Sequence, residues 1–159
     1  MPDPNEGSMT QLSILTTSRT ALLVPDTDHV ELSRLIQEIA WRIDHLQAAT
    51  VAELVSNDVE FRADPDNPVL GREAMAAWGA GFDAANPLPG IRHSVSNARF
   101  VDTGDGTASG TSMLTAYFTP AGQAPTTAPF AVGEDHDTFV RTAEGWKLAS
   151  RLWVPMAIR

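Results

Sequence analysis

Two residues of this chain, Asp44 and His93, carry side chains that can exchange protons and lie in apolar stretches of the sequence. Asp44 closes a run of apolar residues at helical spacing, where an exposed carboxylate would face the negative end of the helix dipole. His93 alternates with Ile91 and Val95 in a strand-like pattern, which predicts that its imidazole points inward. Together they would form an acid–base pair, in which the carboxylate takes or relays a proton and the imidazole assists. A solvated helix-end aspartate and a hydrogen-bonded core histidine are the simpler alternatives.

A second polar cluster spans residues 134–137. Strand alternation puts Asp135 and Asp137 on one face with Phe139, which makes both carboxylates candidates for the same pocket. The outer face of a sheet would suit them equally well. If both point inward, the crowded carboxylates would raise one another's pKa values.

A flat hydrophobic ligand would need apolar walls around such groups. The candidates to supply them are Trp41, Trp78, Phe82, Met113, Phe130 and Trp153, although most such residues belong to an ordinary core. Tyr117 is a further candidate for contact with the substrate. Asn97 could bind a developing oxyanion, or could be a polar residue beside the bulge that the change of alternation before Phe100 indicates. Arg42 and Arg151 could pair with inward carboxylates, with a surface position as the default.

The composition excludes several classes of function. The 159 residues are 43% apolar and 19% charged, and the net charge of -9 repels nucleic acid and anionic membranes. No stretch approaches the roughly 20 apolar residues that span a bilayer. The chain has no cysteine, and its histidines at 29, 45, 93 and 136 lack metal-binding spacing, so neither a metal nor a cofactor is expected. The acidic amino terminus lacks the basic residues of a secretory signal, which predicts a cytoplasmic protein.

The elements that must position these residues follow from periodicity. Apolar residues at three- and four-residue spacing, after a capping box of Asp28 and Glu31, predict a first helix that ends at Asp44. Further helices are predicted over 48–55 and 72–85, and strands over 59–63, 91–100, 108–118, 130–141 and 146–154. This order predicts one α+β domain over 27–159, with a curved antiparallel sheet wrapped around the helices, behind a flexible leader at 1–26. A loop at 120–129 could cover the mouth of its pocket.

Six short motifs occur in a recognisable order: IAWRID at 39–44, LVSNDVEF at 54–61, GREAM at 71–75, RHSVSN at 92–97, FVR at 139–141 and GWKLASR at 145–151. Over about residues 28–154 the chain resembles the SnoaL-like branch of the nuclear transport factor 2-like superfamily. Its relatives include polyketide cyclases, scytalone dehydratase, limonene epoxide hydrolase and ketosteroid isomerase. The resemblance implies a cone-shaped fold, a homodimer, and a pocket into which Asp44 and His93 point.

The resemblance implies a cofactor-independent acid–base enzyme of isomerase, cyclase, dehydratase or hydrolase type. Its substrate would be a hydrophobic small molecule such as a polyketide, terpenoid or steroid-like metabolite. Two tyrosines of the family pattern are absent here, because Ala40 and the run Asp135-His136-Asp137 stand in their places. That departure favours simple proton transfer or cyclisation over dehydration. A non-catalytic small-molecule-binding or dimerisation domain of the same fold is the alternative.

Overall fold

The computed structural model of the chain describes residues 23–125 and 127–158. The predicted leader therefore falls mostly outside the described residues, at 1–22. Its last residues pack on the domain, since Leu23 forms an isolated β-bridge with Val101 and Val24 is buried.

The first described helix, α2, spans Asp26–Asp44 and ends where the sequence predicts. It turns one apolar stripe to the core: Leu32, Leu35, Ile36, Ile39 and Ala40. The predicted capping box is wrong. The helix begins one residue after Pro25 with no capping side chain, because Asp28 lies inside the first turn and forms an ion pair with Arg141.

Two further helical segments pack against each other beside the sheet. The 3₁₀ helix η1 spans Ala48–Leu54, and helix α3 spans Arg72–Ala85. Asp83 of α3 accepts hydrogen bonds from the first two backbone N–H groups of η1, at 3.0 and 3.1 Å. Helix α3 ends at Asn86, whose φ of 42° gives the left-handed conformation common after helices.

Six strands form one curved sheet in the order β2-β1-β6-β5-β4-β3. They span Val55–Arg62 (β1), Val69–Leu70 (β2), Arg92–Gly104 (β3), Thr107–Tyr117 (β4), Ala131–Thr142 (β5) and Gly145–Ile158 (β6). All neighbours are antiparallel except β1 and β6, which are parallel, so the fully antiparallel sheet of the sequence prediction needs this correction. Strand β1 also begins at Val55, earlier than the predicted residue 59.

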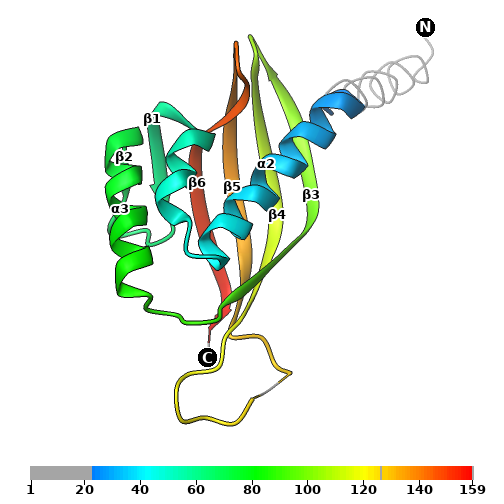
Figure 1. Cartoon of the computed structure of the whole chain (residues 1–159). Helices are drawn as coiled ribbons and strands as arrows, with labels where there is room; N and C mark the ends of the chain where they lie inside the picture. Colours follow the sequence, from blue (N-terminus) through cyan, green and yellow to red (C-terminus); the bar gives the residue numbers. More distant parts are fainter. Residues whose placement is uncertain (1–22, 126, 159) are drawn as a thin grey trace, which may run out of the picture.

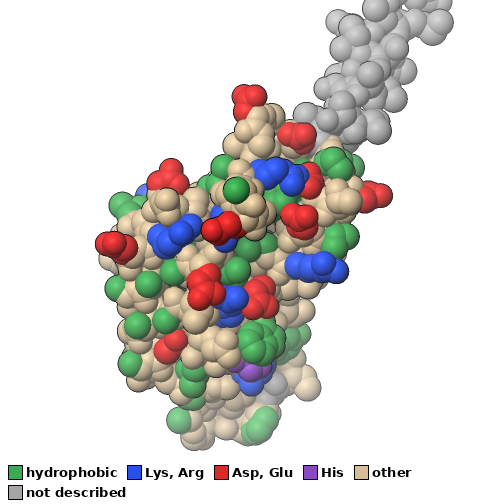
Figure 2. Space-filling view, turned by 45° about the horizontal axis from the view of Figure 1, so that its top comes forward, with side chains coloured by type: hydrophobic (Ala, Val, Ile, Leu, Met, Phe, Trp, Pro, Cys, Tyr) green, Lys and Arg blue, Asp and Glu red, His purple; other side chains and the backbone are tan. Residues whose placement is uncertain are grey.

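The helices lie on one face of the sheet, with α2 crossing β3 to β6 and α3 beside β1 and β2 (Figure 1). The face of the molecule in Figure 2 intersperses acidic and basic side chains with scattered apolar atoms. The apolar sides of the helices therefore turn toward the sheet, where one cluster joins Ile36 and Ile39 to Phe100, Phe139 and Leu148. No helix in the described ranges is long and apolar enough to cross a membrane.

Gly79 tests how tightly α3 packs on η1. A Cβ at this position would lie 2.3 Å from the backbone of Ala48, whereas a Cβ at Gly81 on the same helix would meet nothing within 4 Å. We expect Gly79→Ala to lower the free energy of unfolding by about 1–3 kcal/mol through overpacking. Gly81→Ala, the matched control, should raise it by up to about 1 kcal/mol through helix propensity. Urea denaturation measures both, and equal effects would contradict this contact.

Candidate functional site

A cavity of about 260 Å³ lies between the helices and the concave face of the sheet. Its walls are mainly apolar and aromatic, and they include Phe61, Trp78, Phe82, Leu114, Phe130 and Trp153. Three lining residues carry groups that hydrogen-bond or ionise strongly, namely His93, Asp135 and Arg151. An apolar space with a few convergent polar groups is the usual form of a small-molecule site.

One polar wall is the junction between the end of α2 and the start of β3. Asp44 accepts two bonds from His93, through Oδ1 from the ring Nδ1 at 2.6 Å and through Oδ2 from the backbone N–H at 2.8 Å. Arg92 donates to the backbone carbonyl of Asp44 at 3.0 Å. The side chains of Asp44 and His93 are 5% and 14% exposed, so the helix end, the strand start and the imidazole are held as one unit.

Asp44 and His93 lie at different distances from the cavity at this junction. His93 lines the apolar cavity, whereas Asp44 lies behind it and lines a separate hollow with Ile43, His45 and Arg92. Since Nδ1 is engaged by Asp44, Nε2 is the ring nitrogen left for the cavity. The imidazole is therefore the part of the pair that a ligand would meet.

The other polar wall is a buried ion cluster on β5 and β6. Arg151 donates from Nε and Nη2 to the two oxygens of Asp137, at 2.8 and 2.6 Å. Its Nη1 lies 3.4 Å from Oδ2 of Asp135. All three residues are buried, and Oδ2 of Asp135 has no hydrogen-bond partner within the described residues.

The cluster shifts the ionisation of two of its members. Burial raises the pKa of Asp135 above its ordinary value, and Asp137 adds to that rise while Arg151 and His93 oppose it. Burial alone would lower the pKa of Arg151, but the charges of Asp137 and Asp135 outweigh it and raise the pKa instead. Arg151 therefore stays charged, and burial favours the protonated form of Asp135.

Apart from the two arginines, twelve residues were named from the sequence; six of them line the cavity, and two more stand directly behind it. Trp78, Phe82, Phe130 and Trp153 supply walls, and His93 and Asp135 supply polar groups. Asp44 supports His93, and Asp137 supports Arg151.

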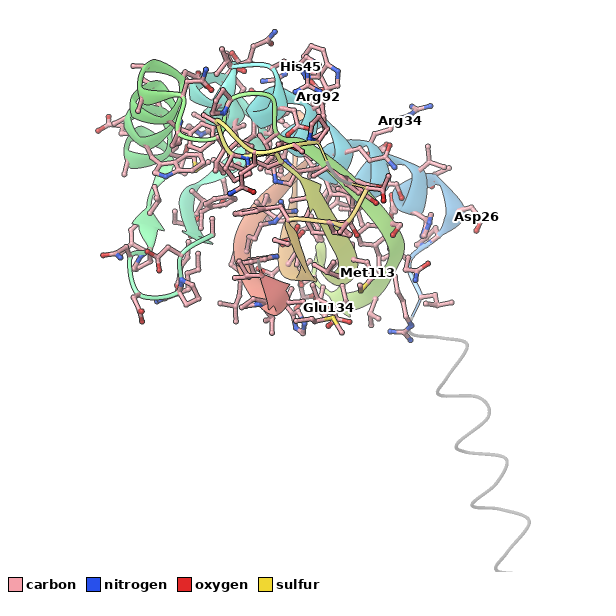
Figure 3. The ribbon with its side chains drawn as sticks, turned by 90° about the horizontal axis from the view of Figure 1, so that it is seen from below. Asp26, Arg34, His45, Arg92, Met113 and Glu134 are labelled. Carbon is pink, nitrogen blue, oxygen red and sulfur yellow. The ribbon has the colours of Figure 1, made fainter. Side chains whose placement is uncertain are left out.

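The other four lie elsewhere. Trp41 is half exposed on α2 and stacks on His45, and Tyr117 is 44% exposed at the end of β4. Asn97 sits in the predicted bulge of β3 with a φ of 51°, which takes its side chain out of the row of His93. Met113 pairs with Glu134 on the face of the sheet away from the helices (Figure 3).

Arg151 is the site residue that sequence reasoning placed at the surface by default. The structure corrects this, because Arg151 is 6% exposed and directly opposite Asp137 in the β5–β6 ladder. The alternation of the final strand was a usable signal, but a bulge beside Thr138 shifts the ladder by one residue. Arg42 faces outward and pairs with Glu38 and Glu53.

No group of three or more potential metal ligands gathers within residues 23–125 and 127–158. The carboxylates of the ion cluster are engaged by Arg151. The polar side chains of the cavity wall, His93, Asp135 and Arg151, can transfer protons or form hydrogen bonds.

Known proteins share the sequence profile and the fold of this chain. The sequence profile of the SnoaL-like domain matches residues 27–152. A candidate scytalone dehydratase from Novosphingobium aromaticivorans DSM 12444 is 22% identical, with 83% of this chain and 88% of that chain covered and a TM-score of 0.68. An NTF2-like protein with a cystatin-like fold from the same species is 22% identical, covering 98% and 92%, with a TM-score of 0.66.

A third structure, a protein from Catenulispora acidiphila in complex with S-DNPA, is 20% identical over 80% of this chain and 92% of that chain, with a TM-score of 0.66. At these identities the likeness shows a shared fold. No curated protein matches the chain significantly.

The raised pKa of Asp135 predicts a particular dependence of stability on pH. A carboxyl whose pKa is higher in the folded chain stabilises fully below its ordinary value of 3.8, and that contribution is lost as pH rises through the folded-state pKa. We expect Asp135→Asn to lack this loss, so its free energy of unfolding should gain on that of the wild type as the pH rises above the ordinary value of 3.8.

Urea denaturation across this range measures the difference between the two proteins. The other groups that act on Asp135, namely Arg151, Asp137, His93 and His136, are present in both proteins. Asp105→Asn, in the exposed β3–β4 hairpin, controls for the removal of one negative charge. Parallel curves for the wild type and Asp135→Asn would contradict the assignment.

Proposed function

Since the chain belongs to the SnoaL-like domain family, we propose that it is a cofactor-independent acid–base enzyme acting on a hydrophobic small molecule. The observation that carries this proposal is the Asp44–His93 pair, which presents one imidazole to a mainly apolar cavity. Such a space is suited to a ligand of polyketide, terpenoid or steroid-like kind, and a structural neighbour from Catenulispora acidiphila was solved in complex with S-DNPA.

His93 is the proposed proton carrier. With Nδ1 hydrogen-bonded to the Asp44 carboxylate, the neutral ring keeps its proton on Nδ1 and its lone pair on Nε2, toward the cavity. After it takes a proton, the imidazolium is stabilised by the same carboxylate, which stays ionised. Asp44 therefore acts as a positioning residue, and the backbone bond from His93 keeps its carboxylate in place.

The reaction class follows from what surrounds His93. The single tyrosine of the chain, Tyr117, is half exposed and lies outside the lining of the cavity. A mechanism that needs a phenol at the substrate therefore has no candidate donor. Proton transfer next to a carbonyl, as in isomerisation or cyclisation, needs only a base and a hydrogen-bond donor for the oxygen.

Replacement of His93 tests the proposal. Because the cavity suits small fused-ring compounds, we expect the protein to accelerate exchange of the α-hydrogens of 2-tetralone in D₂O, followed by proton NMR. His93→Gln should reduce this exchange by about 10²–10⁴-fold. Asp44→Asn should lower kcat while ligand affinity is unchanged, since Asp44 orients the base without touching the ligand.

His45→Gln is the matched control, because His45 is an exposed histidine outside the lining of the cavity and its replacement should leave the exchange rate unchanged. Exchange that survives in His93→Gln would remove the imidazole from the mechanism. Ligand binding without turnover of any ketone would favour the alternative, a small-molecule-binding domain.

We also propose that the enzyme is a homodimer through the outer face of the sheet. Leu152, Val154 and Met156 of β6 expose apolar side chains, and Val154 is paired with Glu134, on the face away from the helices (Figure 3). Such a row of apolar groups suits an interface between copies.

For the 17.1 kDa chain, light scattering should report twice the chain mass. Val154→Asp should shift the protein toward the monomer, because a charge in the interface core is costly. Leu70→Asp, an equally radical change at an exposed residue of β2, should leave the dimer intact. A wild type that is monomeric at all concentrations would refute this assembly.

A further inference from the structure

We propose that the cavity selects an uncharged ligand and holds it by one oxygen at Asp135, with the carboxyl group as hydrogen-bond donor. This inference concerns the same site as the proposed function and rests on it for the existence of a ligand. It adds which chemical class the ligand belongs to and which residue recognises it.

The first argument is a row of polar atoms without partners. Ser112, Asp135 and Trp153 occupy facing positions on β4, β5 and β6. Each carries a buried side-chain atom with no hydrogen-bond partner in the described chain: Oγ, Oδ2 and Nε1. A buried polar group left alone costs about 1–3 kcal/mol. Of these three residues Asp135 and Trp153 line the cavity. Because Arg151 approaches Oδ2 of Asp135 only to 3.4 Å and forms no hydrogen bond to it, the charged form of this carboxyl is compensated only in part.

The second argument is the charge of the lining. Arg151 is the only cationic side chain among the described lining residues that is charged at every ordinary pH. Its Nε and Nη2 are both taken by Asp137, and its Nη1 faces Oδ2 of Asp135. The cluster therefore offers an incoming carboxylate no free cation, while Asp137 and Asp44 add negative charge behind the wall. An anion would be desolvated here without compensation.

The third argument concerns which oxygen of Asp135 faces the ligand and whether it donates or accepts a hydrogen bond. Asp135 lines the cavity, and since Oδ2 is turned to Arg151, Oδ1 is the oxygen that meets a ligand. Burial favours the protonated form of this carboxyl. A neutral carboxyl donates one hydrogen bond, which suits a carbonyl oxygen. His93 on β3 and Asp135 on β5 would then meet the same ligand, one at a carbon-bound hydrogen and the other at the oxygen.

Three naphthalenes of the same shape test this inference by binding alone. 2-Acetylnaphthalene carries a neutral carbonyl, 2-naphthoate replaces it with a charged carboxylate, and 2-isopropylnaphthalene replaces its oxygen with carbon. Isothermal titration calorimetry at pH 7 should show the ketone binding at least about tenfold more tightly than either analogue, a difference of about 1.4 kcal/mol.

Variants at Asp135 assign the preference to this residue. Asp135→Leu should bring the affinity for the ketone to within about twofold of that for the isopropyl compound, since the donor is gone. Asp135→Asn, whose amide still donates, should keep a preference for the ketone. Glu134→Gln, one residue away and on the outer face (Figure 3), is the control and should behave as the wild type.

Several outcomes would overturn the inference. They are naphthoate or the isopropyl compound binding the wild type as tightly as the ketone, or Asp135→Leu keeping the full preference. If Asp135→Leu does not fold, the wild-type ranking and Asp135→Asn decide. The ranking should persist in His93→Gln, so loss of ranking with intact exchange refutes only this inference, and loss of exchange with intact ranking refutes only the proposed function.

Discussion

The bonds between Asp44 and His93 join the two halves of this fold at the point where the cavity begins. Helix α2 and strand β3 are separated in the chain by η1, β1, β2 and α3, yet both oxygens of Asp44 bind one residue of β3. The carboxylate thus fixes the strand through its backbone and the imidazole through its ring. A carboxylate at a helix C-terminus is opposed by the helix dipole. Two short hydrogen bonds offset that cost and explain why an acidic residue can end an otherwise apolar helix.

The opposite wall of the cavity is also held by hydrogen bonds to a buried carboxylate, but here they leave a second carboxyl, that of Asp135, incompletely bonded. Arg151 and Asp137 form a bidentate pair that is almost completely buried, and removing one member of such a pair typically costs about 3–5 kcal/mol. Asp135 shares the cation only at 3.4 Å and so keeps capacity for another partner. The Asp44 contact therefore leaves Nε2 of the His93 ring toward the cavity, and the Arg151–Asp137 pair leaves the Asp135 carboxyl short of hydrogen bonds.

The periodicity of apolar residues was enough to predict the helices and most of the strands. It could not predict the register, that is, which residues of neighbouring strands face each other. The stripe of Met75, Trp78 and Phe82 predicts α3 with its observed ends, because a helical pattern depends only on local spacing. In the β5–β6 hairpin, Phe139 pairs with Leu148, and without the bulge Asp137 would face Ser150 instead of Arg151. One inserted residue moves every later side chain to a new partner. The same effect at Asn97 removes a predicted pocket residue from the cavity.

The cavity itself is maintained by residues that are too small to fill it. Ala40, Ala116 and Ala131 line the space and are each at most 7% exposed, so larger apolar side chains at these positions would extend the core. Such side chains would remove more apolar surface from water and so add to the stability of the domain. A sheet and three helical segments packed only for stability would close this space, and the small residues that keep it open therefore favour the proposed role in binding a ligand.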